Sequence, residues 1–186
     1  MKNKFEKTLV YNCSATLKGL KTGSLFLYKP LSIKKFKTKI YILDKLLSIK
    51  GIRISIINKN SDIKLIYVYR PKMIASMLAK PDYHCFLCQM GYPINKNYKD
   101  NILHLIYKLE KSKDFPHEIG LFLGYPIEDV LGFIKHKGKN YTLCGAWKVY
   151  GKPKDAQKRF DLFENCRKQC MHGLEHGYTI LQLATK

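Results

Sequence analysis

The chain has 186 residues, of which 46% are apolar and 26% are charged, and this balance excludes a disordered or fibrous protein. Its length is most economically one domain, residues 1–186. The net charge of +20 admits a nucleic-acid partner, whereas the lack of an apolar stretch of spanning length argues against a membrane protein.

The first elements in chain order are a strand and a helix. The β-rich run TLVYNC (8–13) predicts a strand, and the small and hydroxyl residues of 14–24 predict a loop after it. From Ser32 onward, apolar residues recur every three or four positions, and Gly51 provides a stop. This spacing predicts an amphipathic helix, with apolar positions at Ile33, Phe36, Ile40, Leu43 and Leu47.

A hairpin and further helices follow. The β-rich runs 52–58 and 63–70 are joined by a polar turn at 59–62, which predicts an antiparallel hairpin. Pro71 can begin the next helical stretch, which Pro81 breaks or kinks. Another helix is predicted from the spacing of Ile102, Leu105, Ile106 and Leu109.

The second half of the chain predicts a central strand and a crossover. EIGLFLGY (118–125) is continuously apolar, as expected for a strand covered on both faces. Pro126 then begins a helix, NYTLCGAWKVY (140–150) supplies another strand, and Pro153 opens a C-terminal helix. Strand, helix and strand in succession favour a right-handed βαβ unit. The predicted fold is α/β, with α+β as the alternative: a single mixed β-sheet with an antiparallel hairpin, a βαβ unit and helices packed on it.

A ligand site is predicted where the 118–125 strand runs into the next helix, because α/β sheets open their crevices at the carboxyl ends of strands. The alternative interpretation is that the acidic residues there only stabilise the helix dipole. Cys13 is the candidate nucleophile, although a structural role competes with that interpretation. The predicted ligand-binding residues are Cys13, Thr16, Lys21, Tyr125, Glu128 and Asp129.

The other end of the same strand provides an alternative site. His117 and Glu118 are an acid–base pair, for which a structural role at the strand entry competes with a role as general base or ligand contact. A strand of this length would hold its two ends more than about 20 Å apart. Only one end can then form a small-molecule site, and we expect it to be the carboxyl end.

Cysteine and histidine residues occur close together at two places in the sequence and are candidate metal ligands. The start of the chain lacks the apolar segment of a signal peptide, so a cytoplasmic protein with reduced thiols is expected. On one continuous helix the C-terminal histidines turn away from the cysteines, and no second C-x-x-C completes a zinc ribbon. We therefore expect no metal at the two concentrations of soft ligands, which are Cys85 with Cys88, and Cys166, Cys170, His172 and His176.

The positive charge is uneven and dominated by lysine. Thirty of the 34 basic residues are Lys, although Arg is the side chain that reads guanine and grips phosphate at two points. Residues 1–50 carry 12 basic and 2 acidic residues. The densest run is interpreted as a solvated helix face, with a polyanion-binding patch as the alternative; it comprises Lys34, Lys35, Lys37 and Lys39.

Four blocks of the sequence carry a resemblance to a known family: 11-YNCSATLKGLKTGSLF-26, the pair Tyr69-Arg70, 116-PHEIGLFLGYPIEDVLGFI-134 and 145-GAWKVYG-151. With these blocks the chain resembles an uncharacterised bacterial family of domains of unknown function, family 3793, found in anaerobes and marked by the block HEIGLFLGYP-x-EDV. The resemblance covers nearly the whole chain and implies no established activity. It does imply a metal- or redox-linked role, through relatives encoded beside ferrous-iron transport and flavodoxin genes.

Two classes of function remain. The first is a small-ligand binding protein, or a metal- or redox-linked one, with its crevice at the 124–129 turn. Enzymatic activity stays open for this class, and the sequence indicates neither a cofactor nor an oligomeric state. The second is a nucleic-acid or other polyanion-binding accessory protein that uses the Lys-rich first half. We favour the first class.

Overall fold

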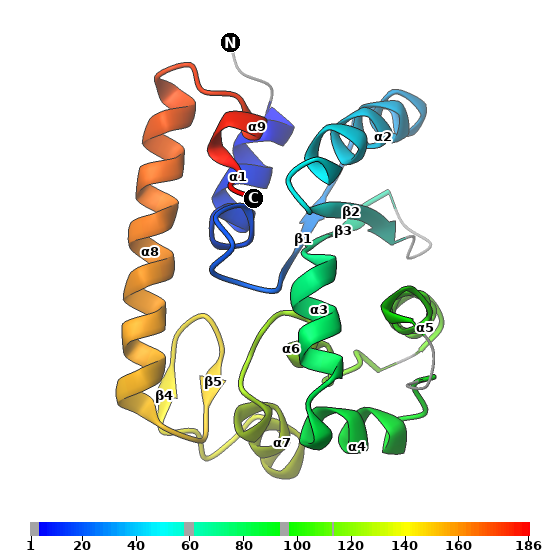
Figure 1. The fold of residues 1–186 in the computed structure, drawn as a ribbon, viewed down its shortest axis with the longest axis vertical. Helices are drawn as coiled ribbons and strands as arrows, with labels where there is room; N and C mark the ends of the chain where they lie inside the picture. The colour runs from blue at the N-terminus through cyan, green and yellow to red at the C-terminus, as the bar shows by residue number, and fades with distance from the viewer. Residues whose placement is uncertain (1–3, 58–61, 94–96, 113) are drawn as a thin grey trace.

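A computed structural model of the protein describes residues 4–57, 62–93, 97–112 and 114–186 (Figure 1). The helices there are α1 (Lys4–Leu17), α2 (Ile33–Ser48), α3 (Pro71–Leu78), α4 (Pro81–Gln89), α5 (Tyr98–Lys111), α6 (Ile119–Phe122), α7 (Ile127–His136), α8 (Pro153–Glu175) and α9 (Ile180–Leu183). The strands are β1 (Gly23–Tyr28), β2 (Arg53–Ile57), β3 (Lys64–Tyr69), β4 (Leu143–Cys144) and β5 (Lys148–Val149). The described part of the chain is therefore mainly helical, and the α/β class is confirmed in this general sense.

The main sheet has three antiparallel strands in the order β1-β3-β2. β3 is central, because Tyr69 pairs with Gly23 of β1 on one side and with Arg53 of β2 on the other. The hairpin predicted from the two β-rich runs is confirmed by the β2–β3 pairing. Its predicted turn, 59–62, lies outside the described residues except for Asp62.

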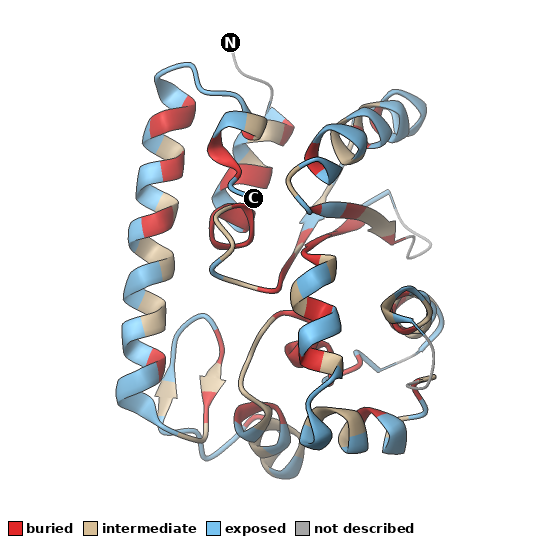
Figure 2. Cartoon of the chain, in the orientation of Figure 1, coloured by how far each residue is buried: buried red, intermediate tan, exposed pale blue. Residues whose placement is uncertain are grey.

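The sheet separates two hydrophobic cores. Along β3, Ile66 and Val68 face a first core formed with α1, α2, α8 and α9, while Leu65, Tyr67 and Tyr69 face a second core formed with α3 to α7. This alternation follows from the two-residue period of a strand. In Figure 1, α1 and α9 accordingly lie beside the upper part of α8, and α3 to α7 gather in the lower half of the molecule. Figure 2 shows that the buried positions of α8 recur along its side toward α1.

A third, smaller cluster surrounds Trp147. The two-residue strands β4 and β5 form a separate antiparallel sheet, and Trp147 lies in the turn between them. Trp147 packs edge-on against Phe160 of α8 and stacks on Tyr125. The sequence predicted one long strand over 140–150 that would share a core with 118–125. The structure has a short hairpin there, with its own cluster.

The predicted first strand is wrong, because residues 8–13 belong to helix α1. TLVYNC is β-rich in composition, but Phe5, Leu9 and Cys13 recur every four residues and are all buried against α8, the sheet and α9. Burial of one helical face outweighs weak local β-propensity. The predicted loop over 14–24 begins only after Leu17, where α1 ends.

The predicted central strand over 118–125 is also wrong. Residues Ile119–Phe122 form the single helical turn α6, which is buried on every side. Gly124 then reverses the chain with a φ of +83°, in contact with Thr22. Because this segment is not a strand, the predicted βαβ unit and single mixed sheet are corrected to two antiparallel sheets within the described residues.

The helices predicted after proline residues are confirmed, with α3, α4, α7 and α8 beginning at Pro71, Pro81, just after Pro126 and at Pro153. The predicted helices from Ser32 and around Ile102 correspond to α2 and α5. In α2 the side chain of Ser32 accepts a hydrogen bond from the backbone N–H of Lys35, as an N-cap does.

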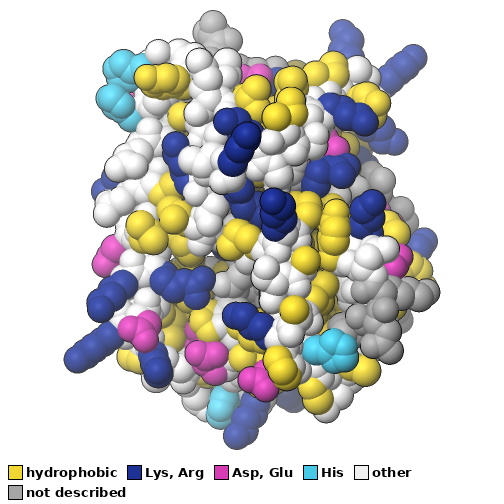
Figure 3. All heavy atoms as spheres, in the orientation of Figure 1, with side chains coloured by type: hydrophobic (Ala, Val, Ile, Leu, Met, Phe, Trp, Pro, Cys, Tyr) yellow, Lys and Arg dark blue, Asp and Glu magenta, His cyan; other side chains and the backbone are white. Residues whose placement is uncertain are grey.

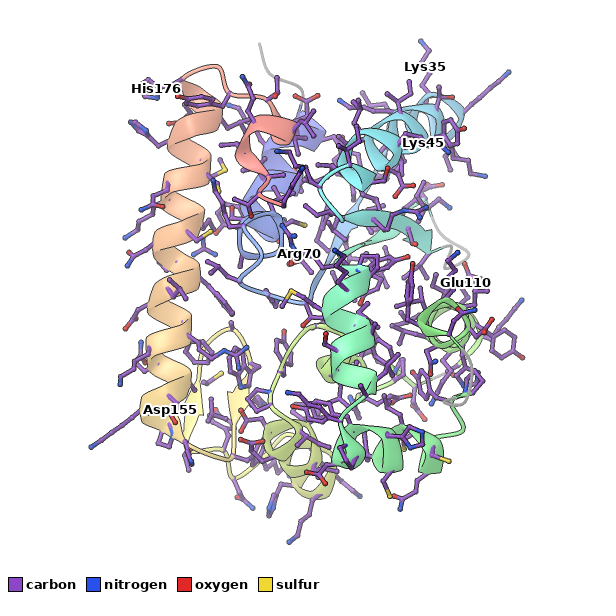
Figure 4. All side chains as sticks on the ribbon, viewed as in Figure 1. Lys35, Lys45, Arg70, Glu110, Asp155 and His176 are labelled. Carbon is purple, nitrogen blue, oxygen red and sulfur yellow. The ribbon has the colours of Figure 1, made fainter. Side chains whose placement is uncertain are left out.

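Arg70, the residue that follows β3, forms hydrogen bonds with distant parts of the chain. Its guanidinium donates to the carbonyl oxygens of Thr16 and Leu17 at the end of α1, at 2.7 Å each, and to that of Thr185 at 2.9 Å. These bonds satisfy carbonyl groups that the end of a helix leaves without partners. Figure 4 shows Arg70 near the middle of the molecule, between α1 and α3. The residue that follows the hairpin thus holds both the end of α1 and the C-terminal segment.

Candidate functional site

Two cavities adjoin the turn between α6 and α7, and a third lies on the other side of Lys21. The polar cleft, about 520 Å³, lies between this turn, α3, α4 and α8. The aromatic pocket, about 420 Å³, lies between α6, α7 and the β4–β5 hairpin. The α1–α8 cavity, about 460 Å³, lies between those two helices and the tip of the hairpin. Tyr125 lines the first two cavities, and Lys21, which lies over its ring, lines the third.

The polar cleft is lined by cations from three parts of the chain. Lys72 comes from α3, Lys80 precedes α4, and Arg159 comes from α8; Glu128 is the one carboxylate among the described lining residues. Lys80 lies 5.1 Å from the centre of the Tyr83 ring, which also lines the cleft. Figure 3 shows basic side chains over this face of the molecule, interleaved with hydrophobic ones. The cleft therefore offers positive charge beside aromatic surface.

Arg159 is held in position at the floor of the cleft. Its Nη2 donates to the carbonyl oxygen of Gly124 at 2.8 Å, and its guanidinium lies 5.0 Å from the centre of the Trp147 ring. A guanidinium over an aromatic face is attracted by the π electrons of the ring. One donor of Arg159 is thus engaged by the turn, and its charge is held among the residues that line the cleft.

Lys21 and Tyr125, both predicted as ligand-binding residues, lie in contact. The Nζ of Lys21 is 5.3 Å from the centre of the Tyr125 ring, and Trp147 stacks on that ring at 4.9 Å. Burial lowers the pKa of Lys21 to about 8, with Arg159 adding like-charge repulsion and Cys13 opposing it. Burial also raises the pKa of Tyr125 to about 12. At neutral pH the phenol is protonated, and its hydroxyl donates to the carbonyl oxygen of Ala146.

Asp129 has a structural position. It is buried, and its carboxylate accepts hydrogen bonds from Trp147 Nε1 at 2.6 Å, the Tyr150 N–H at 2.7 Å and the Gly151 N–H at 2.8 Å. These bonds join α7 to the β4–β5 hairpin. Glu128, by contrast, is exposed and lines the polar cleft. Of this predicted pair of carboxylates, Asp129 organises the hairpin at the edge of the aromatic pocket and Glu128 lines the polar cleft.

Both ends of the 118–125 segment reach one cavity, which the sequence did not predict. His117 is exposed, packs on Phe133 at 4.9 Å and lines the aromatic pocket together with Tyr125 and Asp129. The predicted separation of more than about 20 Å assumed a strand at about 3.3 Å per residue. A helical turn and a reversal at Gly124 bring the two ends together instead.

Glu118 is buried beside His117 but faces the second core. Its carboxylate forms an ion pair with Lys108 of α5 and accepts a hydrogen bond from the Tyr92 hydroxyl at 3.2 Å. Burial and the Glu118 charge both raise the pKa of Tyr92, so that phenol stays protonated. With these partners Glu118 connects α5 to α6, and it lines none of the three cavities.

Cys13 and Thr16 lie in the first core, beneath the α1–α8 cavity. Cys13 is completely buried, which raises the pKa of its thiol to about 12 and keeps it protonated at neutral pH. Thr16 shares a 2.8 Å hydrogen bond with Ser24. Both residues lie near Lys21 in the fold, but their side chains are inside the protein. Neither residue lines any of the three cavities.

The soft ligands do not converge in the described part of the chain. Cys166 and Cys170 are buried against α1, whereas His172 and His176 are exposed at the end of α8, with their ring centres 4.0 Å apart and the rings tilted by 35°. Cys85 and Cys88 are exposed on α4. Within the described residues, no group of three or more His, Cys, Asp or Glu side chains is arranged to hold a metal ion.

The cations and the second tyrosine of the polar cleft are among the lining residues that were not predicted: Lys72, Lys80, Tyr83 and Arg159. They come from α3, from the start of α4 and from α8, which meet only through tertiary packing. No local sequence pattern therefore predicts that these side chains line one cleft. One signal was present, since Arg159 is one of only four arginines in a chain with 30 lysines. Its planar guanidinium suits a position that combines a carbonyl contact with stacking on an aromatic ring.

Comparison with known proteins gives a family but no activity. Residues 9–184 match the family described as protein of unknown function (DUF3793). No curated protein and no solved structure matches the chain. Among the described residues, no helix combines the length and the apolar character needed to cross a membrane. Because the match extends over nearly the whole sequence, the chain belongs to the DUF3793 family.

Proposed function

We propose that the protein binds a small organic anion in the polar cleft beside the 124–126 turn. The observation that carries the proposal is the charge of the cleft, in which Lys72, Lys80 and Arg159 face a single carboxylate, Glu128. No ion pair within 4.0 Å engages these three cations among the described residues. A phosphate or carboxylate entering the cleft would provide the missing counter-charge.

The remaining lining residues indicate what the anion carries. Tyr83 and Tyr125 present aromatic surface, and Met73 and Met77 present flexible apolar surface. Thr22 and Ser76 add hydroxyl groups that can donate hydrogen bonds. This combination suits an aromatic or apolar compound with one phosphate or carboxylate group. A volume of about 520 Å³ is in the range of small-molecule sites.

We expect saturable binding of phenyl phosphate, measured by isothermal titration calorimetry, and weaker binding of inorganic phosphate, which lacks the ring. The double variant Lys72→Gln/Lys80→Gln should weaken phenyl phosphate binding roughly tenfold, through the loss of two charge-assisted contacts. Both lysines are exposed, so the fold should remain intact.

The matched control is Lys154→Gln/Lys158→Gln, which removes the same charge from exposed positions of α8 outside the cleft. It should leave the affinity within about twofold of the unmodified protein. Equal losses in the two double variants would show that only net charge matters. That result, or an absence of saturable binding, would refute the cleft as the site.

A polyanion such as RNA is the second candidate, and one surface favours it. Lys34, Lys35 and Lys37 are exposed on α2, and Figure 4 shows Lys35 extending away from the molecule. Binding there would weaken steeply with salt and would be lost in Lys34→Gln/Lys35→Gln/Lys37→Gln, with the cleft variants unaffected. We favour the small anion, because the cleft combines charge with aromatic surface whereas α2 offers lysines on a convex helix.

The proposal keeps the cytoplasmic location expected from the sequence, and it keeps the metal or redox link as a property of the ligand or as an alternative to test. A cytoplasmic anion-binding protein fits a chain whose cysteines are free. A redox link would act through the ligand, since the cleft residues named above carry no thiol. Metal analysis of protein purified without oxygen tests the remaining alternative, a bound iron or zinc ion.

A further inference from the structure

The α1–α8 cavity contains an amine without an ionic partner. Lys21 lines it, and within the described ranges its ammonium group has no carboxylate or hydrogen-bond partner; the ring it lies over is that of Tyr125, at 5.3 Å. A lysine that is mostly enclosed usually has an acidic neighbour, because burial of an unpaired ammonium is costly. Lys21 instead stands beside another cation, Arg159.

Most of the side chains that line the cavity with Lys21 are uncharged. Ala15 and Ala146 contribute small apolar surfaces, Phe160 and Phe163 contribute rings, and Ser24 contributes a hydroxyl group. At the rim, Arg167 pairs with Glu164, and Asp161 accepts a hydrogen bond from Gln157. Each charged group of the lining other than Lys21 therefore has a partner within the protein, and the space of about 460 Å³ next to Lys21 suits a neutral compound.

We infer that Lys21 is a covalent attachment point for a small, uncharged aldehyde or ketone that enters the α1–α8 cavity. The nitrogen lone pair attacks the carbonyl carbon and forms a C–N bond. The carbonyl oxygen then leaves as water, taking both protons of the amine, and an imine between Lys21 and the ligand remains. No oxidant or reductant is needed for this step, which is reversible by hydrolysis.

The protonation state of Lys21 supports this chemistry. Burial lowers its pKa to about 8. At pH 7.5 about a quarter of such amines are neutral, against roughly 0.1% for a lysine with an ordinary pKa near 10.4. Only the neutral amine is a nucleophile, so Lys21 gains reactivity toward carbonyl compounds at physiological pH. The site differs from the polar cleft, and the inference does not depend on binding of an anion there.

The test uses benzaldehyde as the probe, with cyanoborohydride to reduce each imine to a stable secondary amine. Peptide mass spectrometry then gives a labelling rate for each lysine of the intact protein. We expect Lys21 to be labelled at least about tenfold faster than the exposed Lys154 at pH 7.5, because of its larger neutral fraction. Its rate should rise with pH through about 8 and then level off, because Lys21 is then fully neutral.

A cavity-blocking variant separates the cavity from the amine itself. Ala146 is exposed and lines the mouth, so Ala146→Phe should obstruct entry without disturbing the core and should slow Lys21 labelling several-fold while leaving Lys154 unchanged. The Lys72→Gln/Lys80→Gln variant should label normally, which distinguishes this site from the anion site. Labelling of Lys21 no faster than Lys154, or unaffected by Ala146→Phe, would overturn the inference.

Discussion

Asp129→Ala should lower the free energy of unfolding by about 3–5 kcal/mol. The substitution leaves three donors without an acceptor: the buried indole N–H of Trp147 and the partly buried backbone N–H groups of Tyr150 and Gly151. Urea denaturation followed by circular dichroism measures the loss. Trp147 is the single tryptophan of the chain, so a red shift of its emission would report separation of the β4–β5 hairpin from α7.

The neighbouring carboxylate provides the control. Glu128→Ala makes the same change in charge one residue earlier, at an exposed position, and should alter stability by less than about 0.5 kcal/mol. Asp129→Asn should fall between the two, because its amide oxygen still accepts while its NH₂ group faces a donor. If Asp129→Ala cost less than about 1 kcal/mol, the carboxylate would not be holding the hairpin.

Phe122→Ala should cost about 3–5 kcal/mol, through lost burial and the cavity left behind. Phe122 is completely buried in the second core, where its ring stacks on Tyr92 at 5.4 Å. Its carbonyl oxygen, which accepts from the Tyr67 hydroxyl at 2.9 Å, is unaffected by the change. Leu121→Ala, at the adjacent buried position, should cost about 2–5 kcal/mol. Both values come from chemical denaturation at constant pH.

An exposed apolar residue serves as the reference for this pair. Leu103 on α5 is 63% exposed, and Leu103→Ala should change stability by less than about 0.5 kcal/mol. A change below about 1 kcal/mol for both Phe122→Ala and Leu121→Ala would place α6 outside the core. These expected losses of stability depend only on burial. They are therefore the same whether the segment is a strand, as predicted, or a helical turn.

Elements with a local signal were predictable from the sequence. α2 begins at its Ser32 cap and shows a regular apolar spacing, and the β2–β3 hairpin joins two β-rich runs. Proline residues marked the starts of α3, α4 and α8, because proline suits the first turn of a helix. In each case the deciding interactions lie within a few residues of one another.

The 118–125 segment was not predictable in the same way. A short run that is apolar at every position shows no period, so a strand covered on both faces and a buried helical turn look alike. Tertiary packing decides the conformation of this segment. Gly23 of β1 passes so close to α6 that a Cβ atom there would lie 2.6 Å from the carbonyl oxygen of Phe122. The packing of β1 on α6 is a long-range contact that no sequence window contains.

The sequence pointed to the part of the chain where the candidate site lies, but it did not predict which residues line the site. The expectation of a crevice at the 124–129 turn agrees with the position of the polar cleft, and Lys21 and Tyr125 do lie in contact. Their ligand-binding role remains a prediction. Asp129 resembled a ligand contact in the sequence because a buried acceptor of backbone N–H groups and a functional carboxylate have the same side chain.

The two cores differ in the order in which ribosomal synthesis supplies their residues. The second core is drawn from residues 57–130, a continuous stretch, whereas the first combines α1 with α8 and α9. Domains fold as their residues emerge, so the second core can form while α1 still lacks α8 and α9, although β1 and α2 are already available to it. Arg70 can engage the end of α1 early, but its bond to Thr185 must wait for the C-terminal segment. The apolar face of α1 is thus the surface that a growing chain exposes longest, and chaperone binding or aggregation of an interrupted chain would begin there.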